Sequence, residues 1–416
     1  MRVDKLTEGA VNRLDAARRS RDRAAERVAA RIIADVQRRG DRALADWAAR
    51  LDGMKLSPRR LWVSAAELEA CRRRAPKTLV AAIRQAAGNI RRVAERELPR
   101  PWTVSVARGV RIGHFYQPLD RVGCYVPGGR FPLISTLLMT VVPAQVAGVA
   151  EILVACPRPS PDLLAAAHLL GVRRVLRLGG AQAVAALAYG TKSVPRVDKI
   201  CGPGNRFVTA AKRLVSADCG IDLPAGPTEL LVLAERASPA FIAADLLAQA
   251  EHDPDAVSLF VTPSARLAKQ VLAELEKQLA TLPPGSPARQ SLDRSGPIFL
   301  ARNRAEAIEF SNRFAAEHLS LPDGEALLGK IRAAGSIFVG PWSAQPAGDY
   351  ATGSNHVLPT AGWARARGGL SVTDFLRPIS VQRLSRAGLA GLAQSIVTLA
   401  RSEGLEAHAR AVEVRG

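Results

Sequence analysis

The chain has 416 residues, of which 48% are hydrophobic and 23% are charged, and its formal net charge is +20. This balance is typical of a globular protein long enough for two or more domains. No stretch approaches the roughly 20 uninterrupted apolar residues of a membrane helix, and residues 1–20 lack the apolar core of a secretory signal, so we expect neither a membrane span nor secretion.

The positive charge raises the question of nucleic-acid binding. Basic residues are spread over the whole chain, and the densest run, Arg18 to Arg39, alternates with apolar residues at helical spacing. A solvated helix face accounts for such a run, and it lacks the interleaved aromatic residues that stack on bases. We therefore expect no nucleic-acid partner. The cysteine count is odd, with no CxxC spacing, which favours reduced thiols in a cytoplasmic protein.

In chain order, residues 12–50 predict helices that break at Gly40, and residues 78–97 predict another helix. From Val122 onward, short apolar runs end in glycine turns and lead into helices. The expected strand–helix units are 123–126 with 135–147, 151–156 with 161–170, 175–178 with 181–190, and 199–201 with 208–215. A second series of strands is expected at 229–233, 258–261, 297–300 and 336–339. This alternation is typical of parallel α/β domains.

The expected fold is α/β, with two incomplete Rossmann-like domains built on parallel sheets and a small helical extension from both chain ends. We assign residues 15–120 and 230–365 to a first, discontinuous domain and residues 121–229 to a second domain. Residues 1–14 and 366–416 form the extension. The helical tail at 366–416 has a thin core of its own, so we expect it to pack on a partner subunit.

Gln249 and His252 are three residues apart in a predicted helix that Ser238 and Pro239 open. Residues at that spacing share a helix face, and a carboxamide oxygen beside an imidazole suits zinc. An ordinary polar helix face explains the same pair. The pattern leaves both interpretations open.

Glycine turns at 127–129, 179–180 and 202–204 each stand between a predicted strand and a helix. Backbone amides at such positions can bind phosphate, and ligands of open α/β sheets sit at the carboxyl ends of strands. None of the turns is a complete GxGxxG fingerprint. Nucleotide binding and plain tight turns both remain open.

Three further groups of polar residues could carry chemistry. Glu317 and His318 are adjacent at the edge of an apolar strand. They could be a general acid/base pair or simply two exposed polar residues, and the sequence leaves both interpretations open. Asp349 and His356 share a loop rich in glycine, of a kind that often carries sites. Glu403 and His408 lie near the end of the chain.

Several long motifs together resemble the histidinol dehydrogenase family. They are GGAQA at 179–183, CGPGNRFVTAAKR at 201–213, DLPAGPTELLVLA at 222–234, DLLAQAEHDPDA at 245–256, AAEHL at 315–319 and GDYATGSNHVLPT at 348–360. The resemblance runs in register from about residue 25 to about residue 412. Thr228 stands where the family often has serine, which keeps the hydroxyl.

The resemblance implies oxidation of L-histidinol to L-histidine with two NAD molecules, through an enzyme-bound aldehyde, by a homodimer that holds one zinc ion per subunit. By this resemblance, the expected zinc ligands are Gln249, His252, Asp349 and His408. In the family the tail histidine comes from the other subunit, which would explain the tail's thin core. The first domain would then carry the metal and the catalytic residues, and the second would face the cofactor.

The resemblance also implies residue roles. His318 would be the general base and Glu317 would activate the water that attacks the aldehyde. The substrate-binding set carried over is Thr228, Gln249, His252, His318, Asp349, His356, Glu403 and His408, and the cofactor-binding set is Tyr125, Gln182 and Asn205.

The main alternative is a paralogue that uses zinc and NAD on the same scaffold to oxidise another polar alcohol, such as a sulfonated diol. Glu403 and His408 together favour the imidazole substrate. A nucleic-acid-binding protein on an inactive scaffold would require lost metal ligands, yet all four positions are filled.

Overall fold

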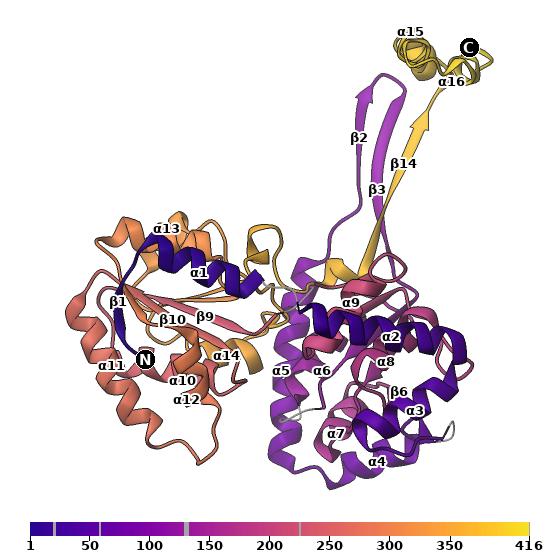
Figure 1. Ribbon diagram of the computed structural model, residues 1–416. Coiled ribbons are helices and arrows are strands. Elements are labelled where there is room, and N and C mark those ends of the chain that lie inside the picture. The colour runs from indigo at the N-terminus through magenta and orange to yellow at the C-terminus, as the bar shows by residue number, and fades with distance from the viewer. Residues whose placement is uncertain (20–21, 58–59, 129–132, 224–225, 416) are drawn as a thin grey trace.

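The computed structural model describes residues 1–19, 22–57, 60–128, 133–223 and 226–415. Within these residues two parallel sheets lie in two lobes, and an antiparallel sheet forms an arm that projects from them (Figure 1). The predicted α/β class with two parallel sheets is confirmed.

The first lobe is built on a six-stranded parallel sheet of order β1-β11-β10-β9-β12-β13. Its strands are β1 (Val3–Lys5), β9 (Glu229–Leu233), β10 (Val257–Thr262), β11 (Ile298–Leu300), β12 (His318–Leu321) and β13 (Ser336–Val339). Its helices are α1 (Glu8–Arg19), α10 (Pro239–Ala250), α11 (Ala265–Leu279), α12 (Ala288–Ser295), α13 (Arg304–Phe314) and α14 (Gln345–Tyr350). Every residue of β9 is buried, as expected for a strand covered by helices on both faces.

The second lobe is built on a five-stranded parallel sheet of order β6-β5-β4-β7-β8. Its strands are β4 (Arg121–Tyr125), β5 (Glu151–Ala155), β6 (Arg174–Leu176), β7 (Lys199–Cys201) and β8 (Gly220–Ile221). Its helices are α2 (Arg23–Arg39), α3 (Asp41–Asp52), α4 (Ala65–Arg74), α5 (Lys77–Glu97), α6 (Ile134–Ala147), α7 (Pro161–Leu169), α8 (Gly180–Tyr189) and α9 (Arg206–Val215). The chain leaves β4 for β5 on one side and returns to β7 on the other, so the order of strands reverses beside β4.

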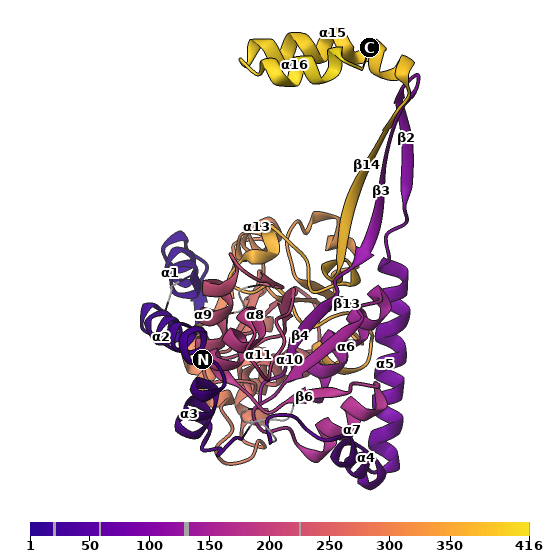
Figure 2. The ribbon, with the colours of Figure 1, turned by 90° about the vertical axis from the view of Figure 1, so that its right-hand side faces the viewer.

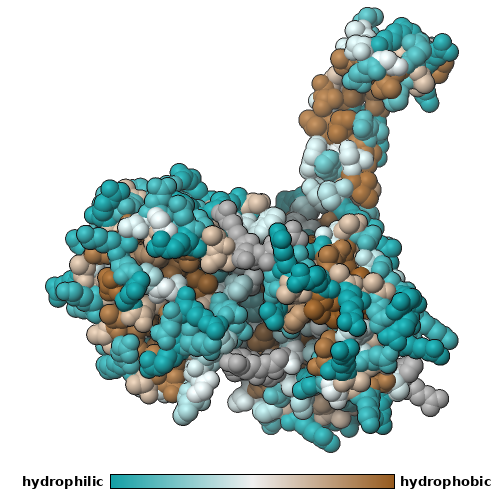
Figure 3. Space-filling view, viewed as in Figure 1, coloured by the Kyte–Doolittle hydropathy of each residue, from teal (hydrophilic) through white to brown (hydrophobic). Residues whose placement is uncertain are grey.

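The arm consists of β2 (Trp102–Ala107), β3 (Val110–Pro118) and β14 (Leu376–Leu384), with α15 (Arg386–Ser402) and α16 (Glu406–Glu413) at its tip. The sheet has the order β14-β3-β2, and both pairings are antiparallel. Figure 2 shows that α15 and α16 stand well away from both lobes. The arm exposes apolar side chains, which include Val104, Val106 and Leu399. In Figure 3 they appear as brown patches along the arm.

Helix α2 carries most of the densest basic run, and it is amphipathic. Its buried positions, Ala25, Ala29, Ile32, Ile33 and Val36, form one stripe at helical spacing. The helix ends at Gly40, whose backbone N–H donates to the carbonyl of Val36 in a conformation with φ of 55°. The stripe packs on α8 and α9, and the predicted break at Gly40 is confirmed.

The predicted domain boundaries are wrong in three places. Residues 1–14 contain β1, which pairs with β11 at the edge of the first sheet, so they are not part of the tail. Helices α2 to α5, from the range 15–120, pack against α6 to α9 of the second lobe rather than in the first. Amphipathic spacing shows that a helix has a buried face, but it does not show which sheet that face covers.

The third difference is in the range 366–416, where the α-helices begin only at Arg386. Residues 372–375 form a short 3₁₀ helix whose Val372 and Phe375 are buried in the core of the second lobe. The next nine residues are strand β14 of the arm. Among the described residues no helix is long and apolar enough to cross a membrane, and all five cysteines are free.

Candidate functional site

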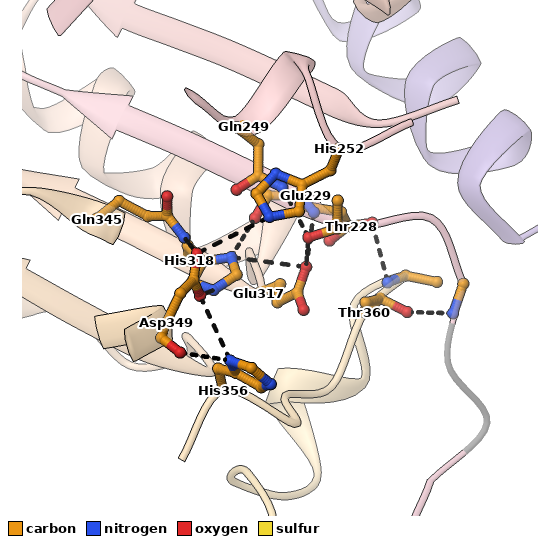
Figure 4. A network of polar contacts seen from close by, with 12 residues as sticks. Thr228, Glu229, Gln249, His252, Glu317, His318, Gln345, Asp349, His356 and Thr360 are labelled. Atoms are coloured by element: carbon orange, nitrogen blue, oxygen red, sulfur yellow. Dashed lines mark hydrogen bonds and ion pairs between the residues drawn. The ribbon is translucent and has the colours of Figure 1, made fainter. Parts of the chain in front are cut away.

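A cluster of polar side chains gathers where the central strands of the first sheet begin. Thr228 and Glu229 stand at the start of β9, and Glu317 and His318 at the start of β12 (Figure 4). These strands are parallel neighbours, so the cluster lies at their amino ends. The loops that enter these strands, rather than the loops that leave them, carry the polar residues of the cluster.

The carboxylate of Glu317 is held from one side by the entry to β9. Its Oε2 accepts hydrogen bonds from the Thr228 hydroxyl at 2.6 Å and from the Glu229 backbone N–H at 2.7 Å. Thr228 Oγ1 in turn accepts a hydrogen bond from Gln249 Nε2 at 2.6 Å. Glu317 and His318 are both buried, so the interpretation of this pair as exposed polar residues is wrong.

The imidazole of His318 has its tautomer fixed by the backbone. Nδ1 donates to the carbonyl of Glu229 at 3.0 Å, which leaves Nε2 as the basic nitrogen of the neutral ring. Nε2 is buried without a hydrogen-bond partner and lies 3.7 Å from Oδ1 of Asp349. A buried, unpaired nitrogen of this kind is suited to receive a proton from a bound molecule.

Asp349 and His356 join the cluster from α14 and the loop after it. His356 Nδ1 donates to the backbone carbonyl of Asp349 at 2.9 Å, and its Nε2 lies 3.4 Å from the Thr136 hydroxyl at the start of α6. Gln345 Nε2 donates to Oδ2 of Asp349 at 2.8 Å. The cluster therefore touches the second lobe through His356.

Gln249 and His252 reach the cluster from the end of α10. The helix begins after Ser238 with Pro239 in its first turn, as predicted, but it ends at Ala250, so the prediction that it contains His252 is wrong. Asp253 precedes Pro254, and a residue before proline is disfavoured in helical conformation. His252 still folds back: its Nδ1 donates to the carbonyl of Ala248 at 2.9 Å, and its Nε2 lies 4.0 Å from Oδ2 of Asp349.

Burial and neighbouring charge shift the pKa values in this cluster. Burial raises the pKa of Glu317 to about 7, although His318, the Thr228 hydroxyl and the Glu229 amide all act to lower it. Burial opposes a charge on His318, but Glu317 and Asp349 outweigh it and raise the pKa of His318. Burial likewise acts to raise the pKa of Asp349. Its contact with His318 and the charges of His318 and His356 nevertheless hold the pKa of Asp349 below its usual value.

The three residues expected to contact a cofactor lie at the carboxyl edge of the second sheet. Tyr125 ends β4, and its hydroxyl accepts a hydrogen bond from the Gly180 N–H at 3.1 Å at the start of α8. Gln182 follows in the first turn of α8 and is buried. Asn205 caps α9 just after β7, where its Oδ1 accepts from the amides of Phe207 and Val208.

The turn between β7 and α9 requires glycine. Gly202 has φ of 112°, and a side chain there would meet the carbonyl oxygen of Tyr125 at 2.1 Å. Of the other expected turns, 179–180 opens α8, whereas that at 127–129 lies partly outside the described residues, because Gly129 is not among them.

Glu403 and His408 do not lie with the other candidates in this chain. Glu403 caps α15 and His408 is in α16, at the tip of the arm in Figures 1 and 2. Both side chains are exposed. In the described residues no group of three or more His, Cys, Asp or Glu side chains is arranged to hold a metal ion, and a single chain brings together only Gln249, His252 and Asp349 of the four expected ligands.

The sequence did not reveal three residues that shape the site. Gln345 is fully buried and supports Asp349, and the separation of four residues within one helix was a usable signal. Glu229 and Arg18 form an ion pair behind Glu317 and His318. No signal marks Arg18 among the 58 basic residues of the chain.

The chain matches known proteins over nearly its whole length. The sequence profile described as histidinol dehydrogenase matches residues 15–416. A histidinol dehydrogenase of Syntrophotalea carbinolica is 46% identical over 397 residues, which cover 94% of this chain and 92% of the relative. One from Halalkalibacterium halodurans is 47% identical over 393 residues, covering 92% of each.

Solved structures give the same result. The crystal structure of histidinol dehydrogenase from Elizabethkingia anophelis superposes with a TM-score of 0.94 at 35% identity, covering 100% of this chain and 98% of that one. A methylmalonate-semialdehyde dehydrogenase from Oceanimonas doudoroffii, 16% identical with a TM-score of 0.51 and covering 92% of both chains, shares the fold alone. The chain therefore belongs to the histidinol dehydrogenase family, a family of oxidoreductases.

Proposed function

We propose that this protein oxidises L-histidinol to L-histidine through L-histidinal, a four-electron reaction that uses two NAD molecules and requires zinc, in the cytoplasm. The observation that carries the proposal is the buried Glu317–His318 pair beside Gln249 and Asp349. Family membership supports the substrate. The geometry supports the roles of the residues.

His318 acts as the base in both oxidations. Its Nε2 takes the proton of the substrate hydroxyl while the carbon loses a hydride. The imidazolium that forms is stabilised by the carboxylates of Glu317 and Asp349, which lie 3.6 and 3.7 Å from its two nitrogens. The carbonyl of Glu229 keeps the ring in the tautomer that this step needs.

Glu317 acts between the two oxidations. A carboxylate with a pKa near 7 accepts a proton from water efficiently at neutral pH. As the water's oxygen adds to the aldehyde carbon, the His318 imidazolium returns its proton to the aldehyde oxygen, which gives the hydrate and leaves His318 neutral again. His318 takes a proton from that hydrate as the second hydride leaves, and the carboxylic acid results.

Zinc fits the residues that the chain provides. Gln249 is fully buried and its Oε1 has no hydrogen-bond partner, which is costly unless the oxygen binds something. His252 donates its Nδ1–H to a carbonyl and so presents Nε2, as metal-binding histidines do. We propose Gln249, His252, Asp349 and the His408 of a second subunit as the ligands; when bound, zinc anchors the substrate's polar groups.

A dinucleotide fits the carboxyl edge of the second sheet. Tyr125, Gln182 and Asn205 lie around the point where the strand order reverses, which is the usual nucleotide site of such sheets. Gly202 allows the turn there to approach the backbone of β4 closely. When bound, NAD accepts the hydride in each oxidation.

We further propose a homodimer with shared active sites, in which the arm brings Glu403 and His408 to the substrate and metal of the other subunit. The exposed apolar side chains of the arm and the distance of its tip from its own site support this arrangement. Glu403 would accept a hydrogen bond from the substrate's imidazole or ammonium group.

The test is NAD reduction by the purified protein with L-histidinol, compared with aliphatic amino alcohols and sulfonated diols. A site built around a hydrogen bond rejects analogues that lack the donor. We therefore expect kcat/KM for L-histidinol to exceed the others by at least about 100-fold. A diol or sulfonate that outperforms L-histidinol would overturn the substrate assignment and leave the family assignment intact.

A further inference from the structure

A buried ion pair lies directly behind Glu317 and His318, and none of the steps above uses it. Arg18 of α1 and Glu229 of β9 have side-chain exposures of only 4% and 2%. Nε of Arg18 donates to Oε1 at 2.7 Å, and Nη2 donates to Oε2 at 2.6 Å. A two-point contact of this kind fixes the orientation of both planar groups.

Arg18 also holds the segment that leads into the other strand of the site. Its Nη1 donates to the backbone carbonyl of Phe314 at 3.0 Å. Its guanidinium carbon lies 3.5 Å from the centroid of the Phe314 ring. Phe314 ends α13 three residues before Glu317, so one arginine ties the start of β9 to the approach to β12.

The backbone of Glu229 contacts both members of the reactive pair. Its N–H donates to Glu317 Oε2 at 2.7 Å and its carbonyl accepts from His318 Nδ1 at 3.0 Å. Its side chain accepts a further hydrogen bond from the Ala361 N–H at 3.0 Å. A shift of Glu229 would therefore move the carboxylate and release the imidazole tautomer at once.

We propose that Arg18 and Glu229 are positioning residues that set the geometry of Glu317 and His318 and thereby the rate of both oxidations. The inference rests on the proposed function for its kinetic readout. Misplacement of reacting groups by about 1 Å costs on the order of 100-fold in rate. Within the described residues, no hydrogen bond or ion pair joins the side chains of the pair directly to Gln249, His252 or Asp349, so replacing them should affect kcat more than metal binding.

The decisive variant is Arg18→Met combined with Glu229→Gln, because it removes both charges of the pair, and Asp15, which lies 3.6 Å from Arg18, keeps its ion pair with Arg313. We expect kcat to fall by about 100-fold with L-histidinol and with L-histidinal. Bound zinc and the KM for NAD should stay at wild-type values. A folded double variant with kcat within about threefold of wild type would overturn the proposal.

Arg18→Lys provides a second test if the double variant does not fold. Lysine keeps the charge but loses the two-point contact, so kcat should fall in a variant that is still folded at the assay temperature. Wild-type kcat in that variant would contradict the proposal.

Arg313→Met is the matched control. Arg313 contacts Asn12 and Asp15 of the same helix α1, and Asp15 keeps its ion pair with Arg18 when Arg313 is replaced, so kcat should stay at the wild-type value. An equal loss of kcat in the control would mean that attachment of α1, and not the pair, matters.

Failure of the proposed function can be told apart from failure of this inference. A wild-type protein that does not oxidise L-histidinol refutes the function alone. A crystal structure of the double variant then tests the pair, since the contacts of Glu229 with Glu317 and His318 should lengthen beyond hydrogen-bond distance. Unchanged contacts would overturn the inference.

Discussion

Three histidines of the site share one hydrogen-bonding pattern. His252, His318 and His356 each donate Nδ1–H to a backbone carbonyl and leave Nε2 for another partner. His318 Nε2 is buried and unpaired, and His252 Nε2 faces Asp349. The backbone thus selects the nitrogen that each ring offers, which residue spacing in the sequence does not reveal.

The first prediction at this scale concerns zinc. His252→Asn removes the imidazole nitrogen expected to bind the metal, so zinc should fall from about one per chain to near zero, and activity should be lost with it. Elemental analysis after dialysis measures this. His168→Asn, an exposed residue of α7, is the control and should retain the metal. Full zinc in the His252 variant would remove that residue from the ligand set.

The second prediction separates the roles of Glu317 and His318. His318→Ala should lower the oxidation of both L-histidinol and L-histidinal by about 10²–10⁴-fold, because a base serves both steps. Glu317→Gln keeps the shape and loses the proton acceptor, so it should impair the aldehyde step more than the alcohol step. Steady-state rates with each substrate provide the measurement. Mild, equal losses in both variants would exclude this division of labour.

The sequence could identify much of the site because its motifs resemble a family, and much less from spacing alone. It placed Glu317 and His318 at the edge of an apolar strand, where the structure has them. It could not identify Arg18. The sequence pattern of an amphipathic helix is the same whether an arginine points to solvent or pairs with a buried carboxylate, and Glu229 lies 211 residues further along the chain.

Among the secondary-structure elements, most strands and helices that alternate in the lobes were predictable, whereas the edge strands β1 and β8 and the arm were not. Continuous apolar runs such as β9 mark buried parallel strands. The residues of β2 are exposed throughout, so no buried face imposes an alternation that marks the strand. Strand β14 pairs with β3 although about 260 residues separate them, and spacing within either segment does not reveal its partner.

The third prediction concerns the turn between β7 and α9. Lys212 of α9 is buried, forms an ion pair with Asp222 and donates to the carbonyl of Gly202 at 2.9 Å. Asp222 also accepts from the Gly202 N–H at 2.6 Å. Lys212→Met leaves the Asp222 charge buried, which should lower the free energy of unfolding by about 3–5 kcal/mol.

Chemical denaturation measures that change. Lys192→Met, at an exposed lysine of the same lobe, is the control and should change stability by no more than about 0.5 kcal/mol. A Lys212 variant as stable as its control would show that the buried pair does not hold the turn.

For the molecule as a whole, the fourth prediction tests the shared site. His408→Ala and His318→Ala should each inactivate the homodimer. If each site takes His408 from the other subunit, mixed dimers contain one intact site, and activity should return after subunit exchange. Exchange is verified with differently tagged chains. No recovery in verified mixed dimers would contradict a shared site.

The first sheet has a consequence for how the chain folds. Its edge strand β1 pairs with β11, so residues 3–5 cannot form their strand pairing until residues 298–300 have been synthesised. In the same way, Arg18 cannot form its ion pair until Glu229 has been synthesised. Most of the second lobe lies between these partners in the chain and can assemble on the ribosome while they are still apart. Pairing of such distant segments is slow, although the loop-closure cost grows by only about 0.6 kcal/mol per doubling of length. The ion pair behind the reactive residues should therefore be among the last contacts to form. During refolding, enzyme activity should recover more slowly than helix content.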